Sequence, residues 1–87
     1  MENKALMRKM ILNTVSTQLR TNNPPETKKT LERLMSEGYS RDDARELIAG
    51  VVVYHIYSML SKNEEFDEKL YVEQLKRLPY MPEGFDG

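Results

Sequence analysis

The sequence contains no cysteine, no tryptophan and only one histidine among its 87 residues. Without cysteine, the chain can form neither a disulfide framework nor a thiolate metal site. A chain of this length buries a modest share of its surface when it folds, so its stability is correspondingly small. Its one core has to be built from ordinary apolar side chains, and association with a further chain is the remaining way to bury more surface.

Long hydrophobic runs are also missing. The longest uncharged stretch, from Leu47 to Ser61, is shorter than the roughly 20 residues that a membrane span requires. No apolar run followed by a small-residue cleavage site stands at the beginning of the sequence. We therefore expect a cytoplasmic protein that has no membrane partner.

Neither sign of charge is in clear excess, because the formal net charge is −1. The charges are nonetheless unevenly distributed. Residues 1–23 contain four basic residues and one acidic residue, whereas residues 63–87 contain three basic and seven acidic residues. The two ends of the chain are therefore electrostatically complementary and could pair within one chain or between subunits.

The first half of the chain predicts two helices. Apolar side chains at helical spacing indicate a helix over residues 3–19, and a second helix is predicted over residues 25–37. Pro25 suits the first helical position because a proline lacks the N–H that would have no partner there. Gly38 follows as the left-handed stop at the end of the second helix.

A longer third helix is predicted over residues 41–61. Ser40 is a typical N-cap, and Asp43 three residues later completes a reciprocal capping pair. No residue from Leu47 to Leu60 is charged, and apolar positions recur there at the helical period. A helix that is apolar nearly all round is covered by neighbours on more than one side. We therefore place this helix at the centre of the fold.

A fourth helix is predicted over residues 67–78. Asp67 is expected to be its N-cap, and Phe66 is placed to pack against Tyr71 in the first turn. Proline ends this helix, and we expect residues 79–87 to form an extended tail.

The elements together predict one all-α domain over residues 1–87, folded as a small four-helix bundle whose third helix is central. The expected helix caps are Pro25, Gly38, Ser40, Asp43 and Asp67. The predicted core residues are Leu31, Leu34, Ala44, Leu47, Ile48, Val51, Val52, Ile56, Met59 and Leu60.

The run LMSEGYSRDDARELI resembles the characteristic segment of ubiquitin-associated three-helix modules, in which a Met-Gly-Phe or Met-Gly-Tyr loop leads to a serine-capped helix. The resemblance implies that protein binding would fall on the loop and on the last helix. This sequence has Glu37 where the methionine should stand, and its following helix is longer than the one in that module. The matching positions are Leu34, Met35, Gly38, Tyr39, Ser40 and Ala44.

A longer resemblance extends from Asn23 to Pro79. The residues that carry it are, in order, NPPE, a threonine, ER and a leucine, EGYS before an acidic pair and an alanine, LIA and a valine, then FD, a tyrosine and LxxLP. This order is similar to that in a family of small bacterial helical proteins, the domain of unknown function numbered eighteen forty-one. The resemblance implies an all-helical bacterial domain without an established activity. A histidine is frequent in that family near the position of Glu46, so a metal or acid–base role at that position is not expected here.

Candidate chemical residues are few. His55 has Tyr54 and Tyr57 near it in sequence, but no second metal ligand or carboxylate stands one helical turn away. A histidine within an apolar helix is most often neutral and hydrogen-bonded in the core. The alternative is a pocket lined by these three side chains, which would bind a small ligand or a metal ion with a carboxylate from another helix.

The joint between the second and third helices has the spacing of a DNA-binding helix-turn-helix. Its second helix would lead with Asp42, Asp43 and Glu46, whose carboxylates repel phosphates, so we expect no nucleic-acid partner. The sequence also has no nucleophile elbow, phosphate-binding glycine loop or HExxH motif.

These observations predict neither an enzyme nor a cofactor-binding protein. We expect a non-enzymatic interaction or assembly module that associates with itself as a homo-oligomer, or with another protein. A small-ligand or metal-binding protein with its pocket near His55 is the alternative hypothesis, and DNA binding by the joint is the third.

Overall fold

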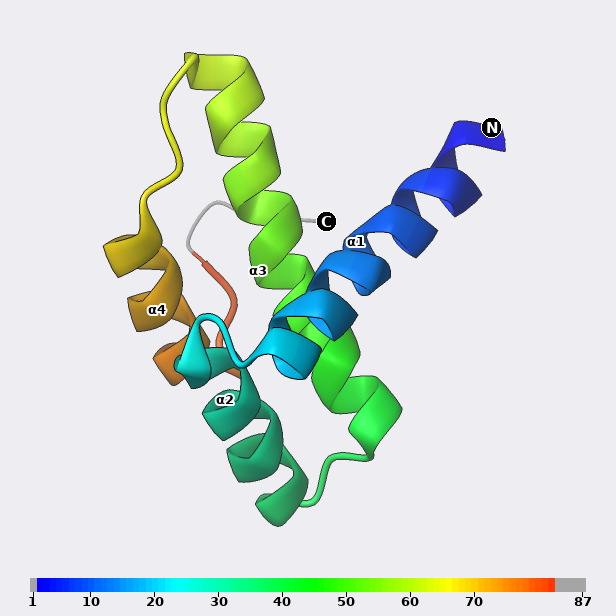
Figure 1. Cartoon of the computed structure of the whole chain (residues 1–87), viewed down its shortest axis with the longest axis vertical. Helices are drawn as coiled ribbons and strands as arrows, with labels where there is room; N and C mark the ends of the chain where they lie inside the picture. Colours follow the sequence, from blue (N-terminus) through cyan, green and yellow to red (C-terminus); the bar gives the residue numbers. More distant parts are fainter. Residues whose placement is uncertain (1, 83–87) are drawn as a thin grey trace.

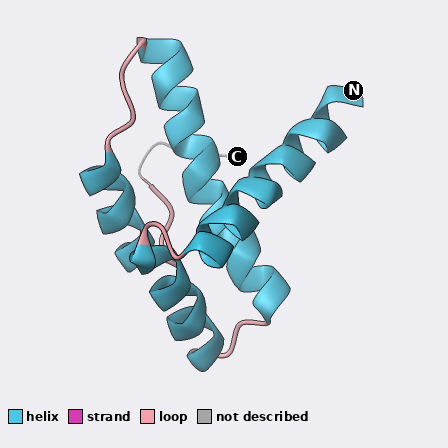
Figure 2. Cartoon of the chain, in the orientation of Figure 1, coloured by secondary structure: helices cyan, strands magenta, loops and turns pink. Residues whose placement is uncertain are grey.

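The computed structural model describes residues 2–82, with side chains from residue 4 onward. This part of the chain forms four helices, and no residue in it belongs to a strand (Figures 1 and 2). The prediction of a small all-α four-helix bundle is therefore confirmed. The helices are α1 (Glu2–Thr21), α2 (Pro25–Ser36), α3 (Arg41–Lys62) and α4 (Glu68–Arg77).

The starts of α2 and α3 are the predicted ones, and the other helix boundaries differ from the prediction by one or two residues. Helix α1 continues to Thr21, where the Thr21 hydroxyl donates a hydrogen bond of 2.7 Å to the carbonyl of Thr17. Beyond α4 the chain is not helical as far as residue 82, and residues 83–87 of the predicted tail lie outside the described part. None of the helices in the described part combines the length and the apolar character needed to cross a membrane.

Helix α3 packs against each of the other three helices, and α2 does the same. In Figure 1, α1 crosses in front of α3, while α4 lies alongside α3. The predicted central position of the third helix is therefore shared with α2, which lies between α1, α3 and α4.

Both ends of α2 have the local structure that the sequence predicts. Pro25 occupies the first helical position, with Pro24 as the N-cap residue. At the other end Gly38 has a φ of +109°, and its N–H donates to the carbonyl of Met35, while the N–H of Tyr39 donates to the carbonyl of Leu34, both at 3.1 Å. This pair of hydrogen bonds is a Schellman motif, and it turns the chain toward α3.

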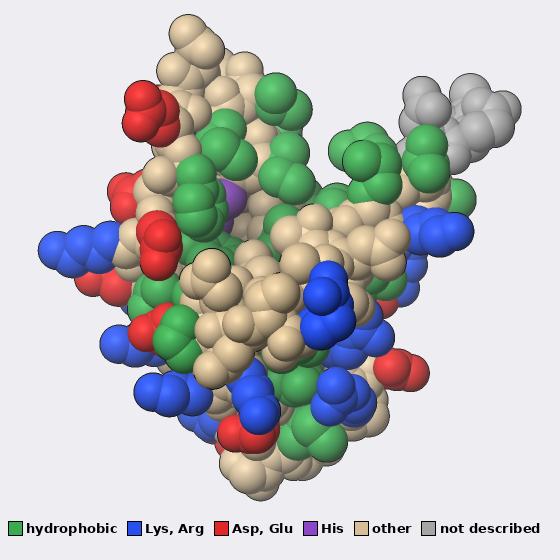
Figure 3. Space-filling model, viewed as in Figure 1, with side chains coloured by type: hydrophobic (Ala, Val, Ile, Leu, Met, Phe, Trp, Pro, Cys, Tyr) green, Lys and Arg blue, Asp and Glu red, His purple; other side chains and the backbone are tan. Residues whose placement is uncertain are grey.

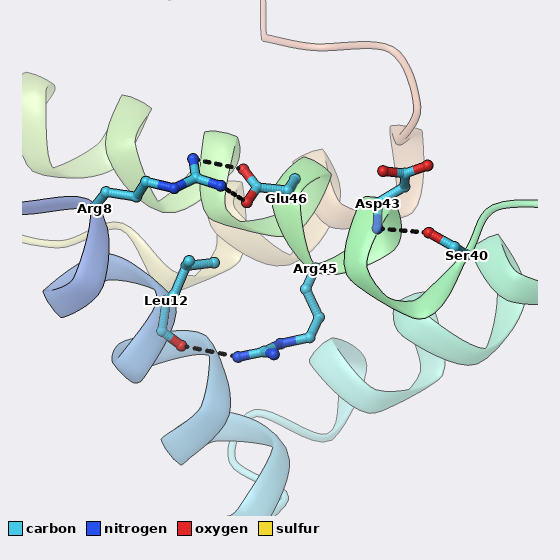
Figure 4. Close-up of polar contacts among 6 residues, drawn as sticks. All are labelled: Arg8, Leu12, Ser40, Asp43, Arg45 and Glu46. Carbon is cyan, nitrogen blue, oxygen red and sulfur yellow. Dashed lines mark hydrogen bonds and ion pairs between the residues drawn. The ribbon is translucent and has the colours of Figure 1, made fainter. Parts of the chain in front are cut away.

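Side-chain caps begin the next two helices. The Ser40 hydroxyl accepts a hydrogen bond of 3.0 Å from the N–H of Asp43, and the Asp67 carboxylate accepts one of 3.0 Å from the N–H of Leu70. The reciprocal half of the predicted Ser40 capping pair is not formed, because the Asp43 carboxylate is directed away from Ser40 (Figure 4). Aspartate is one methylene shorter than the glutamate that usually makes this return bond.

The core lies where the four helices meet. Most of the predicted core residues are there, with Leu47 and Ile56 partly buried at its edge and Met59 partly buried farther along α3. The buried apolar residues are Val15, Leu31, Leu34, Ala44, Ile48, Ala49, Val51, Val52, Tyr71, Leu75 and Leu78.

The prediction is wrong for Leu60, whose side chain is 80% exposed. All residues from Leu60 to Lys69 are exposed, because α3 extends beyond the helices that cover it and the chain leaves through an open loop. Periodicity identified an apolar position correctly, but burial also requires a neighbour at that height along the helix.

We predict that Ile48→Ala lowers the free energy of unfolding by about 2–5 kcal/mol, because the deletion leaves a cavity in the centre of the core. The matched change Leu60→Ala should alter it by no more than about 0.5 kcal/mol, because that side chain is solvated. Urea denaturation at low protein concentration measures both values for the single chain. Equal losses at the two positions would contradict the placement of α3.

Candidate functional site

His55 lies in the core rather than in an open pocket, with only 5% of its surface exposed. Its Nε2 is 2.6 Å from Oε1 of Gln74 on α4. An amide oxygen is an acceptor, so Nε2 carries the proton and donates this hydrogen bond. The rings of Tyr54, Phe66 and Tyr71 surround the imidazole, with centroids 5.3–5.6 Å from its own.

The three side chains of the predicted pocket do not come together. Tyr54 is half-buried against His55, whereas Tyr57 is 71% exposed. The group on α4 that faces the imidazole is the amide of Gln74. A metal or acid–base site would need a carboxylate in this position. Between residues 4 and 82, no three histidine, cysteine or acidic side chains gather in a way that could hold a metal ion.

A second buried polar cluster joins α1, α2 and α4. Oε1 of Gln18 accepts hydrogen bonds from the hydroxyls of Thr27 and Tyr71, both at 2.8 Å. Burial raises the pKa of the Tyr71 hydroxyl above its ordinary value near 10, and the hydrogen bonds to Gln18 and Thr27 partly oppose that rise. The phenol therefore stays protonated at neutral pH, as a hydrogen-bond donor must.

Tyr71 also packs against Phe66, with ring centroids 5.5 Å apart, as the sequence predicted for the start of α4. The hydrogen-bond partners of His55 and Tyr71 were not predicted. For His55, the only signal in the sequence is that Gln74 falls on the apolar face of α4 at helical spacing, which is where a buried amide has to stand.

We predict that Gln74→Leu lowers the free energy of unfolding by about 1–3 kcal/mol, because it leaves the Nε2–H of His55 buried without an acceptor. The double variant His55→Leu/Gln74→Leu should lose less than the sum of the single changes, because it removes both partners. A double-mutant cycle by urea denaturation measures this coupling. Glu73→Leu, at the exposed neighbouring position, is the matched control, and strictly additive losses would contradict the buried pair.

A concave surface lies between α1 and α3. This groove has a volume of about 1000 Å³. Residues 4–12 of α1 line it on one side, and α3 lines it from Asp43 to Val53. Beyond their crossing, the N-terminal half of α1 and the C-terminal half of α3 diverge as the two sides of a V (Figure 1). The lining residues are Lys4, Ala5, Met7, Arg8, Ile11, Leu12, Tyr39, Asp43, Glu46, Leu47, Ala49, Gly50, Val53 and Met81.

Two arginines connect α1 to α3 beside the groove (Figure 4). Arg8 on α1 forms a two-pronged ion pair with Glu46 on α3, in which Nη1 lies 3.0 Å from Oε1. From α3, Arg45 donates to the hydroxyl of Ser16 and to the carbonyl of Leu12. Arg45 holds the crossing point on one side, and the Arg8 pair spans the two walls where they begin to separate.

The floor of the groove contains a glycine that a methionine covers. A Cβ at Gly50 would collide with Cε of Met81, so the absence of a side chain in the middle of α3 provides the seat for Met81. Met81 packs against the core although it belongs to the segment after α4. The chain beyond α4 is therefore attached to α3, and the Met81 side chain forms part of the groove.

We predict that Gly50→Ala displaces the Met81 methyl group while changing the free energy of unfolding by less than about 1 kcal/mol, because the gain in helix propensity offsets the lost contact. In a Met81→Ala background the same change should stabilise the protein by about 1 kcal/mol. The ε-methyl resonance of Met81 and urea denaturation report the two effects. An unshifted methyl resonance would contradict the contact between Gly50 and the Met81 methyl group.

Further apolar side chains are exposed on the two helices that form the groove. On α1, Leu6, Met7 and Met10 are 57%, 53% and 59% exposed. On α3, Tyr57 is 71% exposed and Leu60 is 80% exposed. Figure 3 shows hydrophobic side chains on the two facing sides of the notch between these helices. We call residues 4–10 of α1 the arm, because every side chain in this segment is exposed.

No protein-family model, no curated protein and no solved structure matches this chain. The similarity of the sequence to the bacterial helical family and to ubiquitin-associated modules stays a prediction.

Proposed function

We propose that this chain is a non-enzymatic interaction module, which binds a helix of a polypeptide in the groove between α1 and α3. The observation that carries the proposal is the groove itself, with apolar walls and further exposed apolar residues on the arm and at the end of α3. Contiguous apolar surface of this kind, bordered by polar residues, marks interaction sites in soluble proteins.

The shape and the lining favour a helix as the bound element. An α-helix with its side chains is about 10–12 Å across and inserts apolar residues at positions i, i+3, i+4 and i+7 between two supporting helices. Met7 and Ile11 line the groove from α1, and Leu47 and Val53 line it from α3. Such walls provide the paired apolar rows that a helix of this pattern requires.

The charged rim would determine the orientation of the bound helix. Lys4 and Arg8 stand on the α1 side of the groove, and Asp43 and Glu46 stand on the α3 side. Opposite charges on two sides of an apolar centre are typical of interfaces, where they contribute to specificity more than to affinity.

The same lining favours binding over catalysis. Its ionisable groups are those four charged side chains and Tyr39, and the Arg8–Glu46 ion pair neutralises two of them. A nucleophile with an adjacent base is not among the lining residues. The exposed carboxylates of Asp42 and Asp43 at the start of α3 likewise favour a polypeptide partner over a nucleic acid.

Selection of displayed helical peptides against the purified chain tests this proposal. We expect amphipathic peptides with i, i+3 and i+4 apolar anchors, which shift the amide resonances of Ile11, Leu47 and Val53 on binding. Met7→Glu should weaken their binding at least tenfold, because it places a charge on an apolar wall. Lys29→Glu, at an exposed position outside the groove lining, is the control.

Two outcomes would contradict the proposal. One is that selection returns no peptide with a helical pattern of apolar anchors. The other is that the selected peptides shift resonances only on α2 and α4, away from the groove.

A further inference from the structure

We infer that the helix bound in the groove is the arm of a second copy of this chain, so that two copies exchange their arms reciprocally. The inference rests on the proposed function and identifies its partner. It follows from the exposure of the arm, from the uncovered face of α3, and from the charges that each carries.

The arm is a helical segment whose apolar side chains are not buried by its own chain. Every side chain from residue 4 to residue 10 is exposed, although α1 remains helical through this segment. Leu6 and Met10 are separated by four positions and Met7 and Met10 by three, so the three side chains form one stripe. Two helical turns are too few to be stable alone in water, and an apolar stripe gains stability when another surface covers it.

The C-terminal half of α3 presents a matching stripe. Val53, Tyr57 and Leu60 occupy positions i, i+4 and i+7, so they point to the same side of the helix. Val53 belongs to the groove wall, and the other two are the exposed residues that continue it toward the mouth of the V. Tyr57 and Leu60 are exposed in the part of α3 from which α1 diverges (Figure 1).

Both stripes belong to the same chain, and this makes the exchange reciprocal. An arm that enters the V of a second copy covers the α3 stripe of that copy. In the same movement it brings its own V over the other arm. Each contact then occurs twice about a twofold axis, and the interface closes as a dimer instead of continuing as a filament.

The charges at the mouth of the V are complementary between two copies. The arm contains Lys4, Arg8 and Lys9 and no acidic residue. The loop at the far end of α3 and the start of α4 contain Glu64, Glu65, Asp67 and Glu68, all of them exposed. Within residues 4–82, Arg8 alone among these seven side chains forms an ion pair, and its partner is Glu46. Exchange of the arms would place the unpaired basic side chains of one copy beside the acidic loop of the other.

Sedimentation equilibrium on the purified full-length chain is the first test. We expect a dimer whose dissociation constant increases with ionic strength. Leu6→Glu/Met10→Glu on the arm and Tyr57→Glu/Leu60→Glu on α3 should each weaken the dimer at least tenfold. Tyr80→Glu is the matched control, because Tyr80 is also 80% exposed but lies outside the groove. All the substituted side chains are exposed, and far-ultraviolet circular dichroism verifies that the variants fold.

Charge reversal tests which parts meet. Lys4→Glu/Lys9→Glu and Glu64→Lys/Glu65→Lys should each weaken the dimer, and an equimolar mixture of the two variants should form a heterodimer that is tighter than either homodimer. A mixture of Glu64→Lys/Glu65→Lys with Lys28→Glu/Lys29→Glu, which reverses two exposed lysines of α2, should show no such preference. A preferred heterodimer supports the exchange because only the opposite charges of arm and loop distinguish the mixtures.

A wild-type chain that stays monomeric at its highest soluble concentration would overturn the inference. A dimer that tolerates the substitutions on the arm and on α3 would overturn it as well. The selected peptides then separate this failure from that of the proposed function. A monomer that binds peptides in the groove rejects only the second copy as the partner, whereas a monomer that binds none rejects both proposals.

Discussion

Helix α3 is longer than the helices that pack beside it, and the arrangement of the rest of the molecule follows from this mismatch. Its 22 residues span about 33 Å, whereas the 12 residues of α2 and the 10 of α4 span about 18 Å and 15 Å. The part of α3 from Ala44 to Ile56 is covered on several sides and contains five of the eleven buried apolar residues. The remainder extends beyond its neighbours, and only α1 is long enough to reach it. Because α1 crosses α3 at an angle, the end of α3 is left open (Figure 1), and the groove lies beside α3 from Asp43 to Val53.

Buried and half-buried polar side chains determine how the short helices meet in so small a core. Gln18 joins α1 to α2 and α4, and Gln74 joins α4 to α3 through His55. Arg33 on α2 donates to the carbonyls of Leu75 and Lys76 at the end of α4, at 3.2 and 3.4 Å. Apolar contacts alone tolerate several packing angles, whereas a buried donor without its acceptor costs about 1–3 kcal/mol. These hydrogen bonds therefore favour one packing arrangement of the helices over arrangements with slightly different angles.

The groove connects this architecture to the proposed function. The features that leave it open are the same ones that leave the arm and the end of α3 exposed, so the binding surface results directly from the way in which the core is covered. A small domain without cysteine has few other means to bury additional apolar surface, and association between chains is one of them. The uneven distribution of charge along the sequence supports the proposed dimer, because the basic arm and the acidic loop lie on opposite sides of the V.

The sequence by itself determined the local features of this protein. Four helices, their boundaries to within one or two residues, the Pro25 start, the Gly38 stop and the serine and aspartate caps all depend on residues close together in the chain, and each could be predicted. Only the tertiary structure decided that Leu60 is solvated, that His55 meets an amide of α4, and that a groove opens beside Gly50. A periodic pattern states which side of a helix is apolar, but not how far the neighbouring helices extend along it. Crossing angles and helix lengths decide that coverage, and they result from packing between residues that are distant in sequence.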